Sequence, residues 1–105
     1  MYDSGMKQYS LIIHPFAESD LKIAADWYYL QKEGLDQNFM EEIEKAINRI
    51  KQNPRQFSFV RKKIRMSIVK RFPYGLYYYV TEDIINVFAV FHFSRNPKVW
   101  RKRLK

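Results

Sequence analysis

The clearest strand patterns lie in the C-terminal third of the chain. Two apolar runs, residues 74–80 and 84–93, are separated by a short polar turn at residues 81–83. The second run is apolar at nearly every position and is interrupted only by Asn86 and His92. A strand that is apolar on both faces is typical of a sheet interior covered on both sides. The pattern therefore predicts a hairpin whose second strand is an interior strand.

Alternating patterns predict further strands upstream of this hairpin. Residues 8–14 and residues 64–70 each alternate in the manner of a strand with two different faces. Residues 57–60 suggest a short extended piece ahead of the second of these strands. A long gap separates the 8–14 strand from the others, so its pairing partner stays open.

Helical spacing dominates residues 15–53, where apolar side chains recur at steps of three and four. Gly34 is expected to end the first helix in a left-handed cap, and residues 52–54 to end the second. Helices with so short a joint form an antiparallel hairpin. A third helix of about two turns is predicted from Pro97, with Asn96 as its N-cap. The predicted buried stripes are Phe16, Ala17, Leu21, Ala24, Ala25 and Tyr28, then Leu35, Phe39, Ile43, Ala46 or Ile47, and Ile50.

This order of elements predicts an α+β fold. An N-terminal strand and a helix hairpin precede three or four strands and a short C-terminal helix. Helices followed by strands favour a helix pair on one face of a mainly antiparallel sheet. A chain of 105 residues is the length of one domain. We expect that domain to span residues 8–105 and residues 1–7 to be frayed.

Composition excludes several classes of function. The chain has no cysteine, which rules out disulfides, thiol nucleophiles and thiolate metal sites. Its three glycines form no phosphate-binding loop, and its two histidines lack the spacing of a zinc site. We therefore expect neither a metal nor a cofactor. The acidic side chains are interpreted as solvated helix faces rather than an acid–base pair. No apolar stretch approaches the ~20 residues that span a bilayer, so we interpret the protein as soluble and cytoplasmic.

Charge is divided unevenly between the two halves of the chain. Residues 1–53 carry 6 Lys and Arg against 9 Asp and Glu, a balance of −3. Residues 54–105 carry 13 against 2, a balance of +11. A cationic half of this size attracts a polyanion or an acidic protein surface. The alternative is a charged surface that serves solubility alone.

Cations are interleaved with aromatic residues in this basic half. The cluster comprises Lys62, Lys63, Arg65, Arg71, Arg95, Arg101 and Arg103, with Tyr74, Tyr77, Tyr78, Tyr79, Phe93 and Trp100. Cations neutralise phosphates and flat rings stack on unpaired bases, so the mixture indicates nucleic-acid binding. The alternative for the rings is a place in the sheet core. The candidates for binding a target or a nucleic acid are Lys62, Lys63, Tyr74, Trp100, Arg101 and Arg103.

A second hypothesis is a metal-independent ribonuclease. His92 is the one side chain of the basic half that ordinarily titrates near neutral pH, so it can act as base or acid. Arg65 and Arg71 share one strand parity, and Arg95 follows the end of the neighbouring strand. These three arginines can converge to hold the charge of the phosphorane. The alternative is a histidine that only caps a strand end.

The ordered set of residues resembles the ParE/RelE superfamily of toxins from toxin–antitoxin systems, in particular its ParE-like branch of plasmid stabilisation proteins. In the second half the resemblance lies in Phe72-Pro73-Tyr74, Tyr78, Val90-Phe91-His92, Arg95-Asn96-Pro97, Trp100 and Arg103. In the first half it lies in Pro15, Ala17, Asp20-Leu21, Trp27-Tyr28, Phe39, Ile43, Ile50 and Asn53-Pro54. It covers residues 8–104.

The resemblance implies a toxin neutralised by an antitoxin whose extended or helical tail wraps around it. RelE-like members cut messenger RNA in the ribosome with basic residues and often a late Tyr or His, whereas ParE-like members act on DNA gyrase. Here Trp100 stands near the usual place of the late tyrosine and no tyrosine follows Tyr79, which favours the ParE-like function. The expected partners are an acidic antitoxin, in a hetero-oligomer, and gyrase or ribosome-bound message. The third hypothesis is a non-toxic nucleic-acid-binding module.

Overall fold

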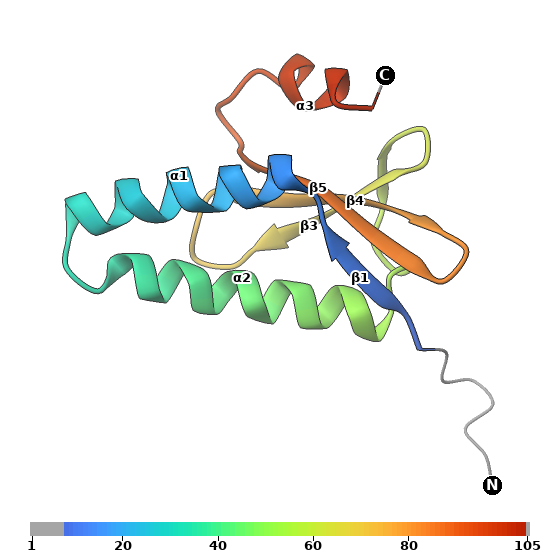
Figure 1. Cartoon of the computed structure of the whole chain (residues 1–105), viewed down its shortest axis with the longest axis horizontal. Helices are drawn as coiled ribbons and strands as arrows, with labels where there is room; N and C mark the ends of the chain where they lie inside the picture. Colours follow the sequence, from blue (N-terminus) through green and yellow to red (C-terminus); the bar gives the residue numbers. More distant parts are fainter. Residues whose placement is uncertain (1–7, 105) are drawn as a thin grey trace, which may run out of the picture.

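A mixed sheet separates a helix hairpin from a short C-terminal helix (Figure 1). The structure is a computed structural model that describes residues 8–104. Its elements are β1 (Ser10–Ile13), α1 (Pro15–Gln31), α2 (Leu35–Gln52), β2 (Phe59–Arg61), β3 (Ile64–Val69), β4 (Tyr74–Thr81), β5 (Ile84–His92) and α3 (Lys98–Lys102). The predicted α+β fold and element order are confirmed. The expected fraying of residues 1–7 lies outside the described residues.

The sheet has five strands in residues 8–104, in the order β1-β5-β4-β3-β2. Neighbouring strands are antiparallel except β1, which runs parallel to β5 with Ser10 opposite Ile84 and Ile13 opposite Val87. This resolves the open pairing of the first strand. It also places β5 between two strands, which confirms the prediction made from its apolar faces. No helix in the described part of the chain is long and apolar enough to cross a membrane.

Each face of the sheet has its own hydrophobic core. The α1–α2 hairpin covers one face, where Phe39, Ile43, Ala46 and Ile50 of α2 are buried as predicted. Full burial of such side chains stabilises the fold by about 1.5–3 kcal/mol each. On the other face the buried ring of Trp100 in α3 stacks on a β4 tyrosine. β5 contributes to both cores, as an interior strand must.

The ends of the helices differ in detail from the sequence prediction. α1 ends at Gln31, and Gly34 adopts its left-handed conformation, φ 88°, at the start of α2 instead. The chain reverses over the intervening residues, so the glycine is needed where the second helix begins. Phe16 is exposed rather than buried, because it lies in the first turn of α1 beside the Arg103 guanidinium. α3 begins at Lys98 rather than Pro97 and has five residues, so it is shorter than the predicted two turns, and its N-cap is Pro97 rather than Asn96. The Asn96 side chain accepts the Lys98 N–H at 3.0 Å just ahead of the helix.

A β-bulge changes the direction of the side chains halfway along β5. Tyr77 pairs with Ala89 and Tyr78 with Val87, so Phe88 is the extra residue. As a result Phe88 and Ala89 both join the core under α3, whereas Val87 and Val90 face the helix hairpin. The bulge therefore shifts the alternation of the β5 side chains by one residue, so that Ile85, Val87 and Val90 lie in one core and Phe88, Ala89 and Phe91 in the other.

The side chains of Asp20 and Arg103 make hydrogen bonds to the backbone of β5 along the part of its edge that β1 does not cover. β1 pairs with β5 only as far as Val87. Beyond that point the Val90 N–H donates to Asp20 Oδ2 at 2.9 Å, and Arg103 Nη1 donates to the Phe88 carbonyl at 3.1 Å. The two side chains also bond each other, at 2.7 and 3.0 Å. Only 12% of the Arg103 side chain and 4% of the Asp20 side chain are exposed.

The interpretation of the acidic residues as solvated is wrong for two of them. Asp20 is buried against Arg103, and Glu42 of α2 is buried with Arg71 and Lys45 each at 3.6 Å. Each carboxylate tolerates burial because a cation lies beside it. Arg103 and Arg71 both come from the basic half of the chain. Part of its +11 charge is therefore neutralised by buried carboxylates within the fold.

Replacing Asp20 by alanine leaves the Arg103 guanidinium and the Val90 N–H without their acceptor. We expect Asp20→Ala to lower the free energy of unfolding by about 3–5 kcal/mol in urea denaturation. Asp26→Ala is the matched control, because this exposed residue of the same helix makes only a surface pair with Lys22. Its cost should stay below about 1 kcal/mol. Equal decreases for the two variants would contradict the role given to Asp20.

Candidate functional site

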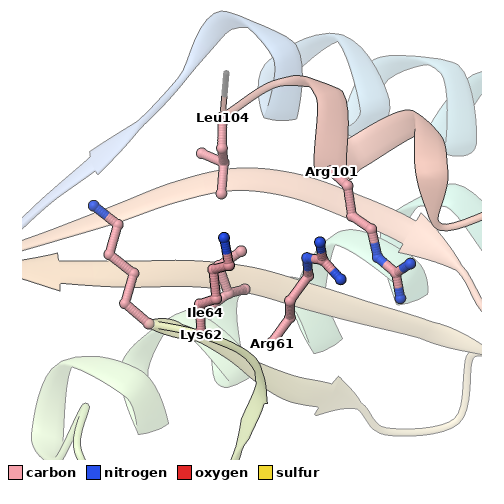
Figure 2. Close-up of a pocket in the computed structure, with 6 residues that line it drawn as sticks. Arg61, Lys62, Ile64, Arg101 and Leu104 are labelled. Atoms are coloured by element: carbon pink, nitrogen blue, oxygen red, sulfur yellow. The ribbon is translucent and has the colours of Figure 1, made fainter.

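A basic pocket lies between the β2–β3 hairpin and α3. Its volume is about 220 Å³. It is lined by Arg61, Lys62, Lys63, Ile64, Arg101 and Leu104 (Figure 2). The hairpin turns at Lys62, which holds a left-handed conformation with φ 50°. This conformation costs a non-glycine residue about 1–2 kcal/mol, and the tight turn that results presents three consecutive cations to one cavity.

No acidic side chain among the described residues lines the basic pocket. The ion pairs of residues 8–104 likewise involve none of its four cations. Lys63 Nζ lies 4.6 Å from the centroid of the Tyr79 ring, and the Arg101 guanidinium lies 5.5 Å from that of Trp100. The buried Arg101 Nε has no hydrogen-bond partner among the residues that the structure describes. The arrangement is therefore suited to an anionic ligand.

An aromatic groove forms a second cavity, of about 490 Å³, between α1 and the ends of β4 and β5. Its lining is Ile23, Ala24, Trp27, Tyr28, Pro73, Tyr74, His92, Ser94 and Arg95. Tyr74 and His92 are cross-strand partners whose ring centroids lie 5.1 Å apart. Burial raises the pKa of the Tyr28 and Tyr74 phenols, so both stay neutral hydrogen-bonding groups. His92 Nδ1 accepts the Ser94 N–H at 3.0 Å, which fixes the imidazole at the rim.

An exposed apolar stripe on α1 continues from this groove. Ile23, Trp27 and Leu30 follow one another at helical spacing and are 65%, 55% and 78% exposed. Ile23 and Trp27 also line the groove. Contiguous apolar surface of this kind on a small protein is characteristic of a partner-binding site. The sequence analysis did not predict this stripe, because it considered only the buried face of α1, which does not include Ile23, Trp27 or Leu30.

The structure divides the predicted binding residues among three places. Lys62, Lys63 and Arg101 meet in the basic pocket, and Tyr74 lies in the aromatic groove. The remaining two, Trp100 and Arg103, are built into the fold: Trp100 is 3% exposed, and Arg103 holds Asp20. Sequence reasoning left out Arg61 and Leu104 of the pocket. Arg61 could have been predicted from the sequence, because it directly precedes the two lysines of the turn.

The predicted ribonuclease residues do not share one cavity in the described part of the chain. His92 and Arg95 both line the aromatic groove. Arg65, in contrast, donates to the Phe57 and Arg55 carbonyls and stacks over a phenylalanine ring. Arg71 lies beside the buried Glu42. The joint action of these residues in RNA cleavage stays a prediction.

Comparison with known proteins assigns the family. The family model described as "ParE toxin of type II toxin-antitoxin system, parDE" matches residues 11–97. The chain belongs to the ParE toxin family. The matched region contains the whole aromatic groove and the β2–β3 side of the basic pocket, but it ends before Arg101 and Leu104.

A solved structure has the same fold. It is the chromosomal ParDE TA system from P. aeruginosa, with a TM-score of 0.73 and 17% sequence identity. The alignment covers 81% of this ParE-family chain and 96% of that chain. At this identity the likeness is one of fold. No curated protein sequence matches the chain.

Proposed function

We propose that this ParE-family toxin inhibits growth by binding a cellular target such as DNA gyrase, and that a cognate acidic antitoxin neutralises it. The observation that carries target binding over RNA cleavage is the separation of the candidate catalytic arginines. Arg65 is held by backbone carbonyls and Arg71 lies beside a carboxylate, so neither is free in the cavity that contains His92. A protein-binding toxin requires no such convergence.

The aromatic groove and the apolar stripe of α1 are the surface that we assign to the antitoxin. A helical segment with apolar anchors fits an exposed stripe at helical spacing that leads into a groove. Arg95 lies in the groove and has no acidic partner in the described ion pairs. An acidic side chain of the antitoxin is its natural complement. The overall charge of +8 favours an acidic partner in the same way.

A ribosome-dependent endoribonuclease is the second candidate, and one observation favours it. His92 and Arg95 lie together in the aromatic groove, where an imidazole and a guanidinium are the groups that RNA cleavage uses. Under this candidate the groove binds messenger RNA, and His92 is the general base or acid.

Two assays with the purified toxin separate these candidates. We expect gyrase to lose supercoiling activity while ribosome-bound message stays intact, because the candidate catalytic residues are dispersed. Intact supercoiling together with cleaved message would contradict target binding. In that case His92→Ala should slow cleavage at least about tenfold, whereas His14→Ala, the control at the other histidine, should leave the rate unchanged.

The antitoxin surface is tested by truncating one ring of the stripe. We expect Trp27→Ala to stay toxic but to weaken antitoxin binding at least about thirtyfold, since a half-exposed tryptophan at a groove is a typical hot spot. Tyr29→Ala is the matched control, because Tyr29 is 59% exposed on the same helix but does not line the groove. The measurements are calorimetric titration with the protein encoded beside the toxin and growth during co-expression. Equal effects of both substitutions would contradict this surface.

A further inference from the structure

We propose that the basic pocket binds the backbone phosphates of duplex DNA. This inference goes beyond the toxin's protein target and does not require that target to be gyrase. It rests on three properties of the pocket, namely its unpaired charge, its converging donors and the absence of an accessible ring in its lining.

The charge of the pocket is uncompensated. Four cations line it, no acidic side chain of residues 8–104 does, and none of the four takes part in a described ion pair. Like charges this close repel one another, so an anion that enters the pocket relieves their repulsion. By contrast, Arg71 and Arg103 of the same basic half each have a carboxylate beside them. The pocket is thus where four unpaired cations of the basic half lie together.

The donors converge from two separate elements. Figure 2 shows the guanidinium groups of Arg61, from β2, and Arg101, from α3, beside each other in the pocket. Guanidinium groups bind phosphate oxygens through paired N–H donors, and lysine adds a point charge. The Arg101 Nε is buried and makes no hydrogen bond within residues 8–104. Phosphate oxygens are suited to the N–H groups that Arg61 and Arg101 present to the pocket.

The two walls are held by the core and do not depend on a ligand. Trp100, the residue before Arg101, is buried and stacks on Tyr77 at 4.7 Å between ring centroids. Arg103, two residues after Arg101, is fixed by Asp20. The opposite wall is the β2–β3 hairpin, which belongs to the sheet. A pocket formed before binding gives up little conformational entropy when an anion enters.

The lining of the pocket offers no aromatic stacking platform. Tyr77 and Trp100 are buried in the core, and the Tyr79 ring carries Lys63 Nζ. The apolar part of the lining is aliphatic, from Ile64 and Leu104. Proteins that prefer single strands stack bases on exposed aromatic rings. This pocket therefore recognises the charge of the phosphate backbone and makes no contact with the bases. Duplex DNA has a higher charge density than a single strand, so the pocket should prefer double-stranded DNA.

The test is binding of the full toxin to fluorescently labelled DNA of about 20 base pairs over a range of salt concentrations. We expect the duplex to bind more tightly than its single strand, without sequence preference. The Arg61→Gln/Lys62→Gln variant should bind about tenfold more weakly, and the negative slope of log K against log salt should become shallower by about 0.9 for each phosphate that the variant no longer neutralises. Arg101→Gln should act in the same direction and tests the other wall.

Lys32→Gln/Lys51→Gln is the matched control, because it removes the same charge from two exposed lysines outside the pocket. It should leave the salt slope unchanged. A control that weakens binding as much as the pocket variant would overturn the proposal, since net charge would then explain the affinity. Tighter binding of the single strand would also overturn it, as would competition by poly-glutamate at equal charge concentration. Because no gyrase is present, these results are independent of the supercoiling assay.

Discussion

Asp20 and Arg103 meet at the stretch of β5 that pairs with β4 on one edge and has no strand on the other. Their ion pair satisfies the Val90 N–H and the Phe88 carbonyl, and it joins α1, the bulged strand and the C-terminal segment at one buried point. A helix of five residues such as α3 is not stable by itself. Its position depends on this pair and on the Trp100 ring. Removing either charge leaves the other buried and uncompensated, so the pair holds the C-terminal segment against the sheet.

The same constraint separates the two proposed binding surfaces. The groove and the α1 stripe lie along the helix hairpin, whereas the basic pocket requires α3 on the other face of the sheet. Because β5 contributes to both cores, the two surfaces share a rigid support but have no lining residue in common. A partner that covers the aromatic groove can thus leave the basic pocket open. In this arrangement a toxin can hold two ligands of different chemistry at once.

Local sequence patterns were sufficient to predict the helices, the strands and the interior position of β5. Periodicity and apolar faces can be recognised from residues that are close together in the sequence. They did not indicate the parallel partner of β1. Nor did they indicate the burial of Asp20, whose partner lies 83 residues away. The lysines of the basic pocket were predicted from composition, but their meeting with Arg101 depends on how the chain crosses the sheet. The predicted strand parity of Arg65 and Arg71 is wrong, because β3 ends at Val69 and Arg71 lies in the turn that follows, with φ 72°. Contacts with a loop and with α2 separate the two side chains further.

Hydrogen exchange at the Val90 amide tests the role of the buried pair most directly. Val90 lies on the edge of β5 beyond the end of β1, and its N–H donates to the Asp20 carboxylate. If Asp20 and Arg103 hold this edge closed, the Val90 amide exchanges as slowly as the amides inside the β4–β5 ladder, by global unfolding. Exchange at the rate of an open strand edge, while the ladder stays protected, would contradict the account.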